Sequence, residues 1–151
     1  MILCLVFTKA QSQKSPTLSG TWKPIIVSSE DFYIDAKKDS IALSDKMKKV
    51  YSGKVSLQNE KAHLRMNYSK NTFVFEQNKD FYFYLGENLN VPIFKGKYET
   101  DKENLKLSVV NRSNISLEKK AAFYFENGLL YLTMHLETNS PVNYVLEKVN
   151  K

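Results

Sequence analysis

The chain has 151 residues, of which 42% are hydrophobic and 25% are charged, as expected for one soluble globular domain. Its net charge of +6 comes almost entirely from lysine, because Arg65 and Arg112 are the only arginines. Nucleic-acid-binding proteins use arginine for bidentate contacts to phosphate and guanine, so this composition argues against a nucleic-acid partner. Aromatic residues, mainly nine Tyr and nine Phe, make up 13% of the chain and favour β-structure.

The first ten residues have the pattern of a signal peptide. An apolar run ends at Phe7, and the small residues Thr8 and Ala10 stand where signal peptidase prefers them. The run is short and no basic residue precedes it, so we interpret residues 1–10 as part of a longer signal peptide; a buried first strand is the alternative. The single cysteine, Cys4, lies in this segment, so the mature chain would have no disulfide and no Cys-based metal site. We expect an exported bacterial protein, periplasmic or extracellular.

The next segment predicts one strand and one loop. Residues 18–27 have the pattern of a turn that leads into a strand, with Pro24 at an edge or a bulge. Residues 28–40 are polar and predict a loop in which the apolar residues 32–34 turn inward.

Helical periodicity begins after this loop. Leu43, Met47 and Val50 are spaced at i, i+4 and i+7, which predicts a helix over residues 41–51. Residues that favour helix ends flank it, namely Asp39 or Ser40 as the N-cap and Ser52-Gly53 as the stop.

Residues 57–68 fit two interpretations. Leu57, Leu64 and Tyr68 share one face of a helix, whereas Ala62, Leu64, Met66 and Tyr68 alternate as in a strand. We favour a second helix, so the 41–68 insertion is expected to contain one or two short helices.

From residue 71 the apolar residues alternate with a period of two, which indicates strands. Hairpin turns are predicted at Asn78-Lys79, at residues 101–104 and at Asn127-Gly128, the strongest short hairpin signal in the chain. Gly96 indicates a bulge, and the last strand is expected over residues 142–149. Six or seven evenly spaced strands predict a mainly β fold, an up-and-down antiparallel sheet that closes into a barrel.

The motif Gly20-Thr21-Trp22 resembles the opening of the first strand in lipocalins and lipocalin-like proteins. The hairpins over residues 71–81 and 96–107, and the closing strand 144–149, are similar to those of exported bacterial lipocalin-like domains. The resemblance covers residues 18–149 and implies a lipocalin-like β-barrel domain in which Trp22 fills one end. Lipocalins place an arginine over this Trp ring, whereas the closing strand here offers only Lys148.

No pattern in the sequence indicates catalysis. His63 and His135 lack the spacing of metal ligands, and the adjacent carboxylates Glu30 and Asp31 would point apart on an extended chain. Phosphate-binding loops, nucleophile elbows and metalloprotease motifs are absent from the sequence. We therefore expect a protein that is not an enzyme and that needs neither a cofactor nor a metal.

Two binding hypotheses remain. The resemblance implies a carrier of a small hydrophobic ligand, and alternation suggests as lining residues Phe73, Phe75, Phe81, Phe83, Phe123 and Phe125. The alternative is an envelope-associated protein-interaction module with a filled barrel. Such a module would use either the aromatic face of Tyr82 and Tyr84 or a lysine cluster suited to a membrane surface, Lys46, Lys48, Lys49 and Lys54.

Overall fold

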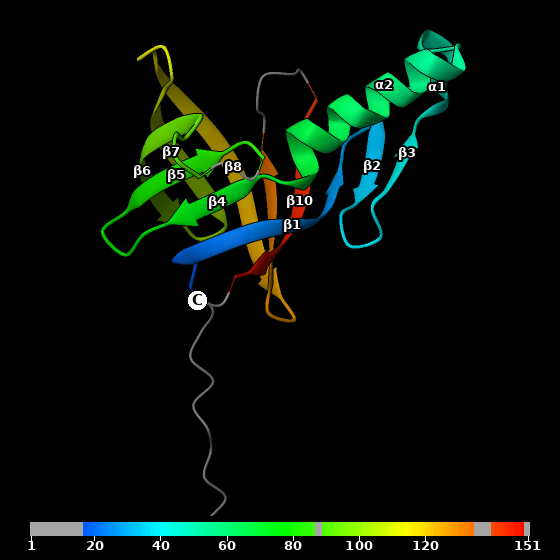
Figure 1. Cartoon of the computed structure of the whole chain (residues 1–151). Coiled ribbons are helices and arrows are strands. Elements are labelled where there is room, and N and C mark those ends of the chain that lie inside the picture. The colour runs from blue at the N-terminus through cyan, green and yellow to red at the C-terminus, as the bar shows by residue number, and fades with distance from the viewer. Residues whose placement is uncertain (1–16, 87–88, 135–139, 150–151) are drawn as a thin grey trace, which may run out of the picture.

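A computed structural model describes residues 17–86, 89–134 and 140–149 (Figure 1). The predicted signal peptide with Cys4, and also His135, lie outside these residues. The strands are β1 (Gly20–Ser28), β2 (Phe32–Asp35), β3 (Ser40–Leu43), β4 (Thr72–Phe75), β5 (Asp80–Tyr84), β6 (Phe94–Asp101), β7 (Asn104–Asn111), β8 (Ser116–Glu126), β9 (Leu129–Met134) and β10 (Val142–Lys148). The helical segments are α1 (Asp45–Val50), α2 (Lys54–Leu64) and the π-helical turn η1 (Arg65–Ser69).

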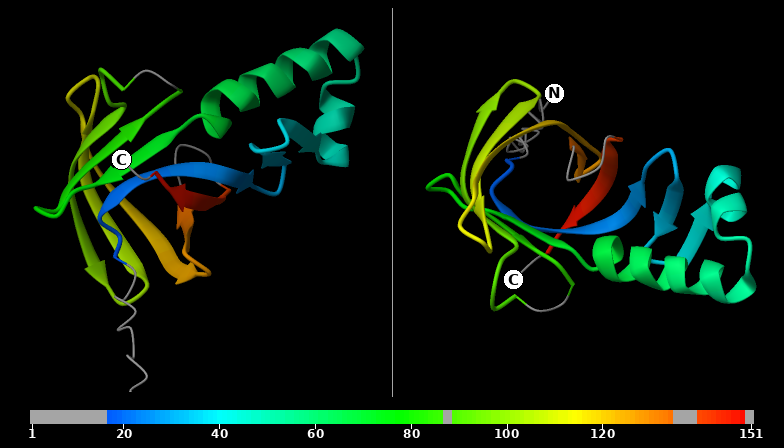
Figure 2. Two further views of the ribbon diagram at one scale, coloured as in Figure 1. Left: turned by 60° about the horizontal axis from the view of Figure 1, so that its bottom comes forward. Right: turned by 90° about the horizontal axis from the view of Figure 1, so that it is seen from above.

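Eight of these strands form a closed antiparallel barrel. Strands β4 to β10 each pair with the next along the chain, and β1 pairs with β4 on one side and with β10 on the other. The ring is visible from above in Figure 2. The structure thus confirms the predicted fold class, a mainly β, up-and-down, lipocalin-like barrel with two short helices in an insertion.

The alternation of side chains along the strands fills the barrel interior. On β7, Leu105, Leu107 and Val109 are buried while the residues between them are exposed, and β9 and β10 repeat this pattern. The apolar side chains of the interior form one continuous cluster that includes Trp22. The predicted inward faces of the strands from residue 71 onward are therefore confirmed wherever the structure describes them.

Residues that tolerate positive φ make the barrel turns. Lys79 (φ 68°) and Lys102 (φ 53°) stand at two of the predicted turns, and Asn127 (φ 51°) and Gly128 (φ 78°) form the predicted hairpin between β8 and β9. Positive φ at both central residues matches the right-handed twist of the flanking strands, so Asn-Gly is favoured there.

The predicted bulge at Gly96 is wrong, whereas the one near Pro24 is confirmed. Gly96 pairs in regular register with both neighbouring strands, but a Cβ there would collide with the Ser108 carbonyl oxygen. Glycine also occurs in strands where another backbone segment approaches closely, and this close approach explains the glycine at position 96. The register of β1 with β10 shifts between Pro24 and Ile26 instead.

The predicted loop over residues 28–40 is also wrong, because β2 and the start of β3 form within it. The hairpin pairs Phe32 with Leu43 and Ile34 with Ile41, and its buried side chains pack toward the helices. Phe32 and Ile34 do turn inward as predicted, whereas Tyr33 is exposed. Four-residue strands separated by a polar turn give too little alternation to be recognised from sequence.

Both predicted helices form with shifted boundaries. The N-cap of α1 is Ser44, whose hydroxyl accepts a hydrogen bond from the Met47 N–H at 3.2 Å, so the predicted caps Asp39 and Ser40 are wrong. Those two residues belong to the β2–β3 turn and to β3. Val50, predicted to lie on the buried face, is exposed because α1 ends there, before the predicted stop.

The second helix confirms the helical interpretation of residues 57–68. Leu64 is buried, and Leu57 and Tyr68 pack against the core, so the predicted face is the one that packs. The Tyr68 ring lies 4.9 Å from the Phe32 ring, which joins η1 to the β2–β3 hairpin.

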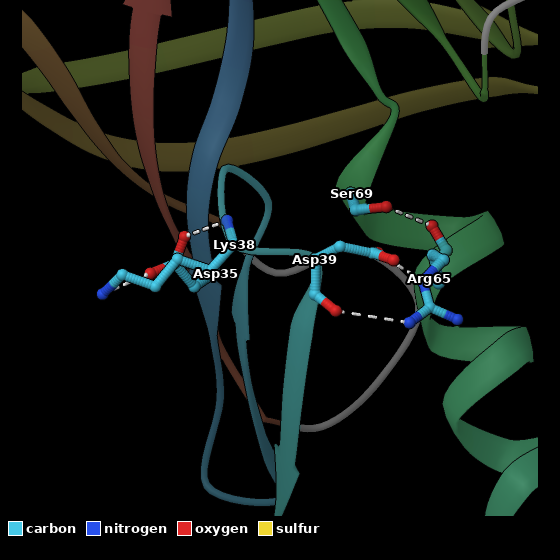
Figure 3. A network of polar contacts seen from close by, with 5 residues as sticks. All are labelled: Asp35, Lys38, Asp39, Arg65 and Ser69. Carbon is cyan, nitrogen blue, oxygen red and sulfur yellow. Dashed lines mark hydrogen bonds and ion pairs between the residues drawn. The ribbon is translucent and has the colours of Figure 1, made fainter.

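A polar network fixes the helices to that hairpin (Figure 3). The Arg65 Nε donates to the Asp39 carboxylate at 2.7 Å, and the Ser69 hydroxyl donates to the Arg65 carbonyl oxygen at 2.7 Å. Across the same turn, the Lys38 N–H and ammonium both contact Asp35, and the Lys38 N–H is the main reason that the pKa of this carboxyl is lowered. The Arg65–Asp39 bond therefore holds η1 at the turn of the hairpin, and the insertion projects from the side of the barrel (Figure 2). Within the described residues, every helix is too short or too polar to cross a bilayer.

Candidate functional site

Trp22 is a buried core residue near the start of β1. The side chain is 2% exposed, its indole N–H donates to the Leu18 carbonyl oxygen at 2.8 Å, and its ring lies 5.9 Å from the Phe125 ring. The hydrogen bond satisfies the only polar group of a ring that is otherwise buried among apolar side chains. That Trp22 fills one end of the barrel stays a prediction.

Lys148 takes the place over the Trp22 ring that an arginine has in lipocalins. Its ammonium lies 5.4 Å from the ring centroid and donates to the Ser19 carbonyl oxygen at 2.7 Å. Gly20 has φ +140°, and a Cβ there would collide with the Lys148 side chain. The Gly-x-Trp spacing thus leaves room for a cation that crosses from the last strand to the first.

The turn between β4 and β5 is fixed to β6. The Tyr98 hydroxyl donates to the Glu76 carbonyl oxygen at 2.9 Å, and the Lys79 ammonium lies 5.0 Å from the centre of the Tyr98 ring. Lys97 pairs with Asp80 at 2.6 Å and is the main reason that the pKa of the Asp80 carboxyl is lowered. Burial raises the pKa of Tyr98, so its hydroxyl keeps its proton to a higher pH than that of an exposed tyrosine.

Between these two anchor points lies a pocket of about 760 Å³. It is lined by Thr17, Leu18, Ser19, Gln77, Lys79, Tyr98, Thr100, Phe123, Phe125 and Lys148. Aromatic rings form part of its wall, two lysines contribute the charged groups, and none of the lining residues is acidic. The volume lies in the range of small-molecule sites.

The structure separates the six phenylalanines that the sequence suggested as ligand-lining residues. All six point into the barrel, but only Phe123 and Phe125 line the pocket. Phe73, Phe75, Phe81 and Phe83 fill the interior as mutual ring contacts, with Phe73 4.9 Å from Phe83 and Phe75 5.0 Å from Phe81. Whether any of the six binds a ligand stays a prediction.

The polar lining residues of the pocket were not identified from the sequence. Gln77 and Lys79 lie beside and in the predicted Asn78-Lys79 turn, whereas Tyr98 lies in the predicted 96–107 hairpin, a different part of the chain. Lys148 was the exception, since the lipocalin resemblance pointed to the closing strand as the source of a cation. The other residues converge only because the barrel closes, which a linear pattern cannot show.

A polar group is also buried at the opposite end of the barrel interior. Asn71 and Thr72 are 0% and 1% exposed, and their side-chain polar atoms and the Tyr144 hydroxyl make no hydrogen bond within the described part of the chain. Burial is the main reason that the pKa of the Tyr144 phenol lies far above its ordinary value; the nearby Tyr68 raises this pKa further, and the Asn71 side chain lowers it. These unpartnered groups are a local cost to stability.

Among residues 17–86, 89–134 and 140–149, no three His, Cys, Asp or Glu side chains gather in a way that could hold a metal ion. His63 is exposed on α2, on the polar side as expected. Comparison of the chain with protein-family models, with curated protein sequences and with solved structures finds no match.

Proposed function

We propose that this is an exported, non-catalytic lipocalin-like protein that binds a small hydrophobic ligand at the Trp22 end of its barrel. The observation that carries this proposal is the pocket of about 760 Å³, walled by Tyr98, Phe123 and Phe125. Aromatic walls and a few fixed polar groups are the usual composition of a small-molecule site.

The charges of the pocket favour an amphipathic ligand with an anionic head group. Lys79 and Lys148 lie on its rim, and the lining contains no carboxylate to compete with a ligand. Both ammonium groups are held over aromatic rings, so they are positioned before a ligand arrives. A carboxylate at the rim would contact a lysine while its hydrocarbon chain covers Phe123 and Phe125.

The alternative is an envelope-associated interaction module with a filled barrel. It is supported by the rings of Phe73, Phe75, Phe81 and Phe83, which leave the middle of the barrel packed with side chains. On the outer face, Tyr124 and Tyr131 stack at 4.6 Å and Tyr124 remains 49% exposed, which offers an aromatic contact surface.

The first experiment separates the two proposals. The protein is purified natively from its own host, extracted with organic solvent and analysed by mass spectrometry. A hydrophobic compound recovered in a fixed ratio to the protein supports the carrier and identifies its ligand class. An empty extract favours the interaction module.

A second experiment tests the site with laurate as the probe and dodecanol as its uncharged counterpart, both by isothermal titration calorimetry. We expect tighter binding of laurate, and a loss of roughly three- to tenfold in laurate affinity for Lys79→Gln, which removes about 1 kcal/mol of charge-assisted interaction. Lys102→Gln is the matched control, because Lys102 also has positive φ in a turn but does not line the pocket. Equal losses in the two variants would contradict the assigned site.

A further inference from the structure

Most of the net positive charge of the chain lies in the helical insertion. Residues 45–66 carry six Lys or Arg and only two acidic residues, a net charge of +4 out of +6 for the whole chain. Of the two acidic residues, Asp45 pairs with Lys48 at 2.9 Å and Glu60 contacts the Tyr51 phenol. The insertion therefore presents an excess of cations in a small part of the surface.

The solvent-facing side of α2 and of the start of η1 carries exposed apolar residues and one asparagine. Leu57 and Leu64 pack toward the core, whereas the opposite face carries residues at i, i+4, i+7 and i+11, namely Val55, Asn59, Ala62 and Met66. Val55 is 70% exposed and Met66 is 61% exposed, and Val50, at the end of α1, is 67% exposed. No charged residue belongs to this face.

A basic groove borders the helix on its Leu57 side. It lies between α1, α2 and β3, has a volume of about 460 Å³, and includes Lys48, Lys54 and Lys61 but no acidic residue. Leu43 and Leu57 form part of its apolar floor. Within the described chain, Lys54 and Lys61 take part in no ion pair, so their charges are available.

We propose that the helical insertion docks the protein on an anionic lipid surface. The three groove lysines contact headgroup phosphates, and Val50, Val55 and Met66 enter the boundary between headgroups and acyl chains. Segments that lie in the membrane interface combine basic residues with exposed apolar side chains. Each lysine near an anionic bilayer adds about 1 kcal/mol to binding. This inference is independent of the pocket at the Trp22 end.

The position of the insertion suits a flat surface. Figures 1 and 2 show α1 and the start of α2 at the outer limit of the molecule, away from the barrel. The bond between Arg65 and Asp39 fixes the other end of the helix to the β2–β3 turn (Figure 3). An acidic protein would also attract the lysines, but it would not require exposed valine and methionine side chains beside them.

The test is flotation of the full chain with vesicles of phosphatidylcholine, with and without phosphatidylglycerol. We expect binding only to the anionic vesicles, and we expect it to weaken as salt is added. The variant Lys48→Gln/Lys54→Gln/Lys61→Gln should bind roughly one hundredfold more weakly, from about 1 kcal/mol for each lysine. The matched control Lys95→Gln/Lys102→Gln/Lys120→Gln removes the same charge from exposed positions on the barrel. Equal loss in both variants would overturn the proposal, because it would show an effect of net charge alone.

A second arm tests insertion of the apolar face. Val55→Trp places a reporter on that face, while Trp22 gives a constant background because it is buried. We expect a blue shift of fluorescence with anionic vesicles, and no shift with soluble glycerol phosphate or with polyglutamate. A shift with polyglutamate, or flotation with phosphatidylcholine alone, would contradict the proposed lipid surface.

Discussion

The Lys148 ammonium lies 5.4 Å from the centre of the Trp22 ring and donates to the Ser19 carbonyl oxygen at 2.7 Å. One side chain of the last barrel strand thus covers the end of the interior and fixes the segment before the first strand. We expect Lys148→Ala to lower the free energy of unfolding by about 1 kcal/mol, from one hydrogen bond and one cation–π contact. Urea unfolding measures this difference.

Two further variants serve as controls for the Lys148→Ala measurement. Lys148→Arg should retain most of the stability, because a guanidinium group also stacks on an aromatic face and donates hydrogen bonds. Lys120→Ala removes an exposed lysine from β8 and should change the free energy of unfolding by less than about 0.5 kcal/mol. A Lys148→Ala variant no less stable than Lys120→Ala would show that the contact contributes nothing.

Phe83→Ala tests which face of β5 is inside. The Phe83 ring is 4% exposed and contacts the rings of Phe73 and Phe94, so its removal leaves a cavity. We expect a loss of about 3–5 kcal/mol in the free energy of unfolding, measured in urea. The neighbouring Tyr82 lies on the outer face, and Tyr82→Ala should cost less than about 1 kcal/mol. Similar losses in the two variants would be incompatible with the burial described above.

Replacing a glycine in a strand with alanine usually stabilises the strand. At position 96, however, we expect Gly96→Ala to destabilise the protein. A Cβ at this position would collide with the Ser108 carbonyl oxygen and lie 2.7 Å from Val109 Cα, both backbone atoms of the paired strand. The two strands must separate locally, which we expect to cost about 1–3 kcal/mol. Thermal unfolding compared with that of Lys95→Ala, an exposed neighbour on β6, isolates the steric effect; a stabilised Gly96→Ala would contradict it.

Alkaline pH should unfold the protein through Tyr144. Burial raises the pKa of this phenol in the folded state, so above about pH 10, the ordinary tyrosine pKa, the unfolded state loses the proton first. The contribution of this phenol to the free energy of unfolding is therefore constant below that pH, and it decreases as the pH rises above it. Tyr144→Phe removes a hydroxyl without a hydrogen bond, so it should match the wild type at neutral pH and resist alkali better. Circular dichroism followed between neutral and alkaline pH is the measurement, and parallel pH profiles would rule out this role.

The sequence was most informative where strands are long and their turns distinctive. Alternation from Phe73 onward placed the interior residues, and Asn127-Gly128 marked its hairpin, because period and turn chemistry are local properties. The β2–β3 hairpin was missed, since four-residue strands have almost no period. Gly96 was misassigned because its reason is the Ser108 carbonyl across the ladder, and no local pattern reveals a cross-strand neighbour.

The residues of the candidate site were likewise only partly predictable from the sequence. Trp22 was singled out through the Gly-x-Trp motif, whereas Lys148 was noted only as a departure from the arginine of lipocalins. Lys79 and Tyr98 join them only after the strands have closed into a ring, so their convergence depends on three-dimensional topology. Phe73 and Phe83 point inward as alternation required, but period alone cannot separate rings that fill a core from rings that line a pocket.

The pairing of β10 with β1 makes closure of the barrel a long-range event. Lys148 bonds to Ser19 across 129 residues, so the second edge of the first strand is covered only when β10 has docked on it. Until β10 pairs, β1 and β9 keep unpaired edges, and such edges invite association with other chains. The final docking of β10 is thus the step that removes both exposed edges from the folding chain.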